Sequence, residues 1–275
     1  DEVFEEGWRE KLEKIWDKKV TRVAYNYNWQ LDDQGNPKVN FYIEKIHSRF
    51  DYKWTHPVHE ILEYTKKDVE NKVYTDEITL NHYPDTSKSR SSYLSLLELS
   101  VKENPSDDRN MHYLGREYMY YKKWDLCIDT LIKHLNLPSA TWKDERCASM
   151  RFIARSYLNL NRIDEARMWL DKAMEEAPYL RDAFVERAWL EYFQGNYKDT
   201  IKYGELALKI KKHPKTYINE VFSWDHTIYD LLSIAYYNEG NYQKSLENVD
   251  KAIDICASND ITRLKENRKI IKSSI

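Results

Sequence analysis

The sequence is poor in glycine, in cysteine and in excess charge, and each shortage argues against a class of function. Six glycines among 275 residues, with neither a G-x-G-x-x-G nor a P-loop motif, leave little scope for a loop that cradles phosphate. The three cysteines, at Cys127, Cys147 and Cys256, form no C-x-x-C pair, which argues against a disulfide framework or a cysteine zinc site and favours a reducing, cytoplasmic compartment. A net charge of −3 gives no general attraction to nucleic acid, and no apolar run is long enough for a membrane span.

What the sequence does contain is a pattern of helix pairs that recurs at about 34 residues between Asp108 and Asn259. Each copy reads as a first helix with aromatic and small residues, a turn at Gly or Asn, and a second helix with small residues. The clearest copies carry these positions at Ala154, Tyr157, Asn161, Ala166, Leu170 and Ala173, and again at Ala188, Tyr192, Gly195, Tyr197, Thr200 and Ala207. The period and layout are those of the tetratricopeptide repeat, in which small residues let paired helices approach and aromatic rings fill the seams.

The sequence therefore predicts an α+β protein whose all-α part is a tetratricopeptide superhelical array over residues 86–275. The repeats are expected near residues 108–141, 147–180, 181–214 and 226–259, with a capping helix at 260–273. Residues 142–146 and 215–225 lengthen two connections, and insertions in such arrays collect on one face, which is often the binding face. Packing as wedges between repeats, or contacts in a homodimer, is the other interpretation of these stretches.

Residues 1–85 have a different pattern and predict a small β-containing unit. A short amphipathic helix is expected at 6–18, followed by a hairpin of strands 20–31 and 39–46. Residues 50–57 read as a loop that leads into an edge strand, and strands 61–64 and 78–82 are expected to pair.

Several stretches resemble family 2 glycosyltransferases of the GT-A fold. The opening segment, Asp1 to Trp8, is similar to the tail of their acidic Asp-x-Asp-Glu motif, and Trp54 with Pro57-Val58-His59-Glu60 is similar to a tryptophan and His-Glu segment late in that domain. The succession Asn81-His82-Tyr83-Pro84-Asp85, Lys88-Ser89-Arg90 and Leu114-Gly115-Arg116-Glu117-Tyr118 resembles bacterial and phage-associated members that carry a C-terminal tetratricopeptide unit. The resemblance implies that residues 1–85 are the C-terminal portion of a GT-A domain, and we expect the donor-binding half to lie upstream of Asp1.

The resemblance implies a specific chemistry. A sugar would pass, with inversion, from a nucleotide sugar to a protein, peptide or glycan acceptor, and a divalent metal, Mn²⁺ or Mg²⁺, would neutralise the charge that builds on the diphosphate. The residues so implied are Asp1 and His59 for the metal, His59 and Glu60 for catalysis, and Glu2, Trp54 and His56 for the donor or acceptor. Judged by residue type alone, the His59-Glu60 pair fits equally well as a hydrogen-bonded pair that closes a sheet edge.

A non-catalytic scaffold is the alternative function. In that interpretation the array binds a peptide in its concave groove and residues 1–85 are a structural remnant. Because the donor-binding half is expected upstream, we predict that this chain alone does not transfer sugar.

Overall fold

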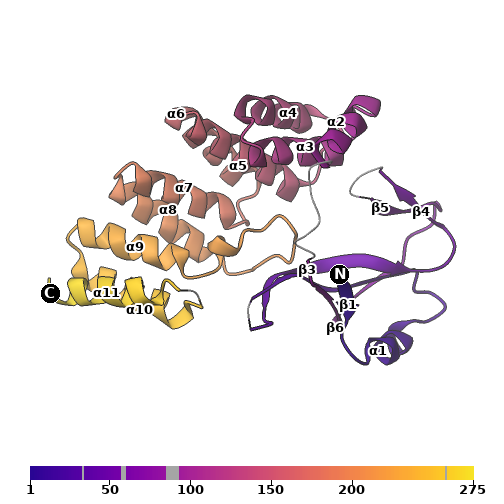
Figure 1. Ribbon diagram of the computed structural model, residues 1–275, viewed down its shortest axis with the longest axis horizontal. Coiled ribbons are helices and arrows are strands. Elements are labelled where there is room, and N and C mark those ends of the chain that lie inside the picture. Colours follow the sequence, from indigo (N-terminus) through magenta and orange to yellow (C-terminus); the bar gives the residue numbers. More distant parts are fainter. Residues whose placement is uncertain (33, 57–59, 85–92, 258) are drawn as a thin grey trace. The chain divides into compact units, whose positions relative to one another are not determined.

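The computed structural model describes residues 1–32, 34–56, 60–84, 93–257 and 259–275, and its contacts divide them into two units (Figure 1). The first unit comprises Asp1–Asn110 with Lys215–Tyr217, and the second comprises Met111–Pro214 with Ile218–Ile275. The predicted boundary after residue 85 falls where the undescribed residues 85–92 begin. The division by contacts comes later, because helix α2 (Tyr93–Glu103) and the first residues of the next helix belong to the first unit.

A four-stranded mixed sheet forms the centre of the first unit. Its strands are β1 (Glu2–Phe4), β6 (Lys72–His82), β2 (Arg22–Leu31) and β3 (Pro37–His47), in that order across the sheet. The β1–β6 and β2–β3 pairs are antiparallel, whereas β6 and β2 run parallel. The predicted hairpin is therefore confirmed as β2 and β3.

The sheet buries one face against a short helix. Tyr25, Tyr27, Ile78 and Leu80 form its core, because alternate residues of β2 and β6 point to the same side. Helix α1 (Trp8–Ile15) covers them with the apolar face that the sequence predicted.

The expected pairing of residues 61–64 with 78–82 is wrong. Strand β5 (Ile61–Tyr64) instead pairs antiparallel with β4 (Tyr52–Thr55), in a segment predicted as a loop. Strand β6 already has β1 on one edge and β2 on the other, so it offers no free edge to β5. The β4–β5 ribbon is supported by cross-strand aromatic contact, with the rings of Tyr52 and Tyr64 5.1 Å apart.

The second unit is an array of antiparallel helix pairs, as predicted (Figure 1). Among the described residues, none of its helices combines the length and apolar character needed to cross a lipid bilayer. Its elements are α3 (Asp108–Tyr120) with α4 (Trp124–Asn136), α5 (Lys143–Asn159) with α6 (Ile163–Glu176), α7 (Asp182–Phe193) with α8 (Tyr197–Lys209), α9 (Thr227–Asn238) with α10 (Tyr242–Ile255), and the capping helix α11 (Ile261–Lys272). Residues 143–146 prove to be the first turn of α5 rather than an insertion.

The turn inside each pair has the same backbone form but not the same residue. Lys122, Asn161, Gly195 and Gly240 all have left-handed φ, between 58° and 75°. In each case the next N–H donates back to a carbonyl in the last turn of the first helix, as from Lys123 to Tyr118 at 2.8 Å, and this bond ends the helix. Lysine at one of these positions was not foreseen, because its side chain disfavours left-handed φ.

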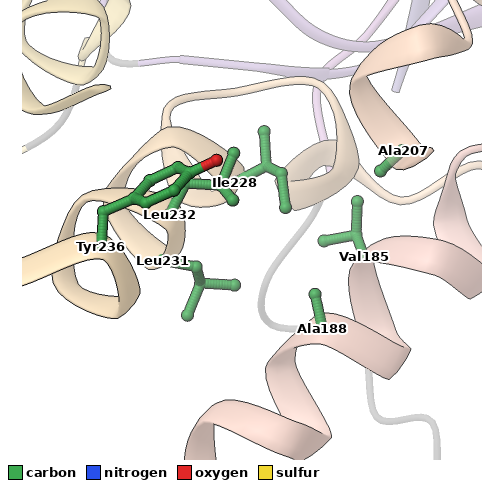
Figure 2. Close-up of a cluster of buried hydrophobic side chains, with 7 residues drawn as sticks. All are labelled: Val185, Ala188, Ala207, Ile228, Leu231, Leu232 and Tyr236. Carbon is green, nitrogen blue, oxygen red and sulfur yellow. The ribbon is translucent and has the colours of Figure 1, made fainter. Parts of the chain in front are cut away.

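Small residues on the paired helices let neighbouring elements meet closely. Figure 2 shows one such seam, where α7, α8 and α9 come together. The side chains that fill it are Val185, Ala188, Ala207, Ile228, Leu231, Leu232 and Tyr236. Between α3 and α4 the approach is closer still, since a Cβ on Gly115 would lie 2.3 Å from a methyl carbon of Leu131.

The cysteines are free, and two of them are buried thiols as predicted. Burial raises the pKa of Cys127 to about 11 and the pKa of Cys147 to about 12. Both stay protonated at neutral pH and serve as small apolar side chains in the seams.

Candidate functional site

The residues predicted to carry sugar transfer take varied places in the first unit. Glu2 lies on β1, where it accepts a hydrogen bond from the Tyr27 hydroxyl at 2.7 Å and has the Lys45 ammonium at 3.5 Å. Asp1 accepts a hydrogen bond from the Tyr83 N–H through its backbone carbonyl, which holds β1 in the sheet. Glu2 therefore has a structural role in the sheet that is sufficient to account for it.

The histidine-rich segment follows β4. Trp54 lies on that strand with about half of its surface exposed, and His56 follows the strand with a left-handed φ of 68°. The His56 ring contacts the buried Asp107 carboxylate, Nδ1 to Oδ2, at 2.5 Å. Glu60 is exposed, and His59 lies outside the described residues, so the predicted metal pair of Asp1 and His59 stays a prediction.

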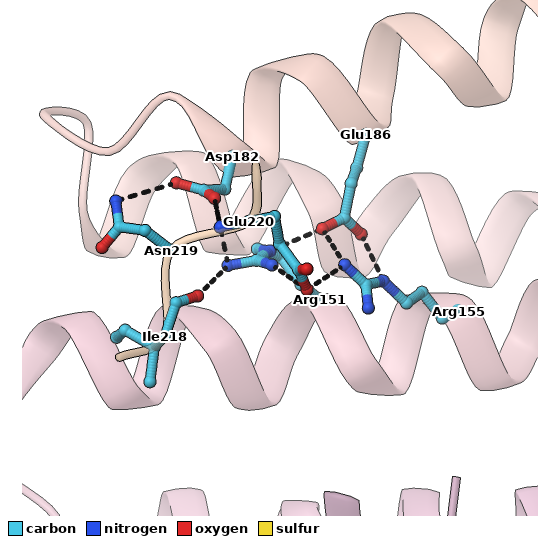
Figure 3. Close-up of polar contacts among 7 residues, drawn as sticks. All are labelled: Arg151, Arg155, Asp182, Glu186, Ile218, Asn219 and Glu220. Atoms are coloured by element: carbon cyan, nitrogen blue, oxygen red, sulfur yellow. Dashed lines mark hydrogen bonds and ion pairs between the residues drawn. The ribbon is translucent and has the colours of Figure 1, made fainter. Parts of the chain in front are cut away.

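The clearest polar site lies instead in the array, between the first helices of two successive repeats (Figure 3). Helix α5 contributes Arg151 and Arg155, one helical turn apart, and α7 contributes Asp182 and Glu186 with the same spacing. The fifth member, Glu220, comes from the connection between α8 and α9. We call these five residues the arginine cluster.

Short contacts join the members of the arginine cluster. The Glu186 carboxylate accepts from Arg151 Nε at 2.6 Å and from Arg155 Nε at 3.0 Å. Glu220 Oε1 accepts from the Nη2 atoms of Arg151 and Arg155, at 2.9 and 2.6 Å. The Asp182 carboxylate stands 3.9 Å from Arg151 Nη1 and accepts the backbone N–H of Glu220 at 2.6 Å. Planar guanidinium groups suit such two-pronged contacts with carboxylates.

Burial and charge oppose each other in this cluster. Burial would raise the pKa of Glu186, but attraction to Arg155 and Arg151 outweighs it and lowers that pKa to about 2. Burial wins at Asp182, whose pKa is raised although Arg151 and the Glu220 N–H act in the other direction. Both arginines stay charged, because their carboxylate neighbours raise the guanidinium pKa against the effect of burial.

The segment that supplies Glu220 makes further contacts with the array on both sides of that residue. The Ile218 carbonyl accepts from Arg151 Nη1 at 3.4 Å, just before Glu220. Further along, the Trp224 ring has the Arg181 guanidinium 3.8 Å from its centroid and the His213 ring stacked at 4.1 Å. The interpretation of Trp224 as a packing wedge is thereby confirmed.

Sequence reasoning singled out residues 215–225 but missed the arginine cluster that receives them. A usable signal was present, since two arginines four residues apart in one first helix are followed by two acids four residues apart in the next. Residues with that spacing share a helix face, and successive first helices of a repeat array are neighbours. Charges at such positions predict an ion-pair cluster between repeats.

Comparison with known proteins identifies two of the helix pairs. The model of the tetratricopeptide repeat family matches residues 152–179, which cover the second half of α5 and all of α6, and residues 226–259, which cover α9 with α10. Both stretches are tetratricopeptide repeats. The tetratricopeptide array predicted from the period is thus confirmed in these two pairs. No curated protein matches the sequence.

Solved structures share the fold of the array at low sequence identity. Cut9–Hcn1, a hetero-tetramer of APC/C, is 12% identical and superposes with a TM-score of 0.51 over 66% of this chain and 33% of its own. MamA is 14% identical, with a TM-score of 0.47 over 70% of this chain and 99% of its own. A thermophilic tetratricopeptide protein of Thermus thermophilus is 16% identical, with a TM-score of 0.45 over 67% of this chain and 89% of its own. These likenesses concern the fold alone.

Proposed function

We propose that the tetratricopeptide array is a protein-interaction module that binds an extended acidic segment of a partner protein across α5 and α7. One observation carries the proposal. Residues 218–220 lie outside the repeats and contact these two helices through a backbone carbonyl, a backbone N–H and one carboxylate (Figure 3). The same face can offer the same three contacts to a segment of another chain.

The charges of the site favour an acidic occupant that can exchange. The side chains of Arg155 and Glu220 are 26% and 28% exposed, so their contact can be reached from solvent, whereas Arg151 is 1% exposed. If a partner carboxylate replaced Glu220, Arg151 would keep its bond to Glu186. Binding would therefore exchange one carboxylate for another without leaving a buried guanidinium unpaired, which is the costly outcome.

A peptide copied from this chain can stand in for the partner segment in a direct test. In a loop variant carrying Ile218→Gly, Asn219→Ser and Glu220→Gly, the face is vacated while the chain length is kept. A labelled peptide of residues 216–223 is expected to bind this variant with 1:1 stoichiometry and the wild type at least about tenfold more weakly, because the wild type's own segment competes. Fluorescence anisotropy at increasing salt would measure both affinities.

Two changes identify the contacts involved. A peptide with glutamine in place of Glu220 should bind the loop variant about tenfold more weakly or worse, since a charge-assisted hydrogen bond contributes roughly 1.5–3 kcal/mol. Arg155→Met in the loop variant should weaken binding similarly. Arg162→Met is the matched control, because Arg162 is exposed and pairs with Glu165. Equal binding of both peptides, or no binding to a folded loop variant, would refute the proposal.

Sugar transfer by residues 1–85 rests on the sequence resemblance and stays a prediction. Both matched repeat segments lie in the array, and His59 lies outside the described residues. Calorimetric titration with nucleotide diphosphate sugars and Mn²⁺, on the wild type and on His59→Ala, measures whether a donor site exists. Metal-dependent binding that disappears in His59→Ala would support the enzyme hypothesis. No detectable binding by a folded chain would contradict it.

A further inference from the structure

A second buried polar cluster lies between the first two helix pairs of the array. It consists of His112 on α3, His134 in the last turn of α4, and Glu145 and Ser149 on α5. The residues are almost fully inaccessible, with exposed fractions of 0% for His112, 1% for His134, 4% for Glu145 and 0% for Ser149. We call these four residues the histidine cluster.

The serine hydroxyl contacts both imidazole rings. Ser149 Oγ lies 2.7 Å from His112 Nδ1 and 3.0 Å from His134 Nδ1, and the ring centroids of the two histidines are 5.5 Å apart. Both rings are therefore oriented from the same side by one small hydroxyl. Such a contact on one ring nitrogen commonly fixes a histidine whose other nitrogen binds a metal.

The other nitrogen of His134 faces a carboxylate at an unusual separation. His134 Nε2 lies 3.4 Å from Glu145 Oε1, whereas a charge-assisted hydrogen bond between such groups is about 2.7–2.9 Å long. Within the described part of the chain, this buried nitrogen makes no hydrogen bond. Two ligands that share a tetrahedral zinc ion, each about 2.0–2.1 Å from it, lie roughly 3.4 Å apart.

His112 completes a set of three ligands. One ligand atom from each of His112, His134 and Glu145 lies within 4.8 Å of the other two. Among the described residues, no other group of three His, Cys, Asp or Glu side chains meets this criterion. Two imidazoles and one carboxylate favour zinc over magnesium or calcium, which prefer oxygen ligands alone.

We propose that His112, His134 and Glu145 form a binding site for one Zn²⁺ ion, which joins α3, α4 and α5 at the start of the array. Complete burial denies a substrate access to the ion, so its role is structural. Ser149 is a positioning residue, since it contacts the two rings and does not belong to the ligand set. A hydrogen-bonded His–Ser–His chain without metal is the competing outcome.

Metal analysis of the full chain tests the site. After dialysis against a chelator, titration with Zn²⁺ should load one equivalent per chain that survives desalting, measured by inductively coupled plasma mass spectrometry. Zinc should also raise the melting temperature, because an ion that binds the folded state alone stabilises it by mass action. Co²⁺ in its place should give visible absorption bands that the metal-free protein lacks.

Variants separate this site from adventitious binding. His134→Gln and His112→Gln should abolish retention of the equivalent of zinc, and Ser149→Ala should weaken affinity about 10–100-fold, as expected when a group that orients a ligand is removed. His226→Gln is the matched control, because His226 is also a buried residue and its Nε2 also lies 3.4 Å from one carboxylate, that of Asp260. It should retain the zinc.

Either of two results would overturn the proposal. One is a folded wild-type chain that retains no zinc and shows no change in melting temperature. The other is an equal loss of zinc in His226→Gln and His134→Gln. If the histidine variants fail to fold, as judged by circular dichroism, Ser149→Ala decides the question, because it keeps all three ligands and should still weaken zinc binding.

Discussion

Helix α5 carries two buried polar clusters on different faces, and they balance their charges in different ways. Toward α7, Arg151 and Arg155 meet the carboxylates of the arginine cluster at distances of 2.6–3.0 Å for the closest contacts. Toward α3 and α4, Glu145 meets His134 at 3.4 Å, and the short contacts of the histidine cluster run through the Ser149 hydroxyl. One cluster carries its counter-charges within the chain, and the other has the geometry of a site that receives a cation.

The difference shows how an array accommodates polar groups in its seams. A buried charge is tolerated when oppositely charged partners and hydrogen bonds surround it. In the arginine cluster those partners come from a neighbouring repeat and from an extra segment of chain. The charges are therefore paired only when these parts of the array are folded together. In the histidine cluster the Glu145 carboxylate meets the His134 ring at 3.4 Å, and under the zinc proposal we expect the charge balance to depend on metal.

The largest effect is expected from removal of the central guanidinium. Arg151→Met should lower the free energy of unfolding by about 3 kcal/mol, because it leaves the buried Asp182 without its cation and Glu186 with Arg155 alone. Urea denaturation at pH 7 measures the change. Arg162→Met, at an exposed ion pair, should shift stability by no more than about 1 kcal/mol. A loss below about 1 kcal/mol in Arg151→Met would show that the arginine cluster is not a paired charge network.

A pH titration distinguishes charge pairing from simple burial. The pKa of Glu186 is lowered from 4.5 to about 2, so its ionised form stabilises the fold above pH 4.5, and this contribution disappears as the pH falls toward 2. Glu186→Gln should therefore cost about 3 kcal/mol at pH 7, and its difference from the wild type should shrink between pH 4.5 and 2. Because the Glu186 charge is one cause of the raised pKa of Asp182, the variant also changes the titration of Asp182. A constant difference across this window would contradict the assignment.

The smallest effect is expected in the histidine cluster without metal. In zinc-free protein Ser149→Ala should cost about 1–2 kcal/mol, since it removes one buried hydroxyl that contacts two imidazoles. Urea denaturation of the zinc-free protein at pH 7 measures the cost, and a loss as large as that of Glu186→Gln would mean that the two clusters contribute alike to stability.

The array could be predicted from the sequence because its information is local and periodic. Tyr157, Tyr192 and Tyr236 lie near the C-terminal ends of α5, α7 and α9, which are the first helices of successive pairs. The β4–β5 pairing could not be predicted in the same way. The sequence pattern does not say which strands lie beside β6. Only the folded sheet shows that β1 and β2 occupy its two edges.

The two polar clusters differ in how visible they are in the sequence. The arginines and acids of the arginine cluster have a four-residue spacing that marks one face of each helix. His112, His134 and Glu145 follow no motif spacing, and only the folding of three helices brings them together. The predicted site residues of the first unit, Glu60 and His59 above all, rest on a resemblance, and they stay predictions.

The two-sided character of α5 also bears on how such an array can evolve. Repeat arrays gain and lose helix pairs as units, since each pair closes its own turn through its own backbone hydrogen bonds. The second pair of this chain is an exception to free exchange. Its deletion would take Glu145, Ser149, Arg151 and Arg155 at once, and would leave His134 and Glu186 facing repeats with nothing to match them. Recombination at this position would have to supply matching side chains in the repeats on both sides of α5.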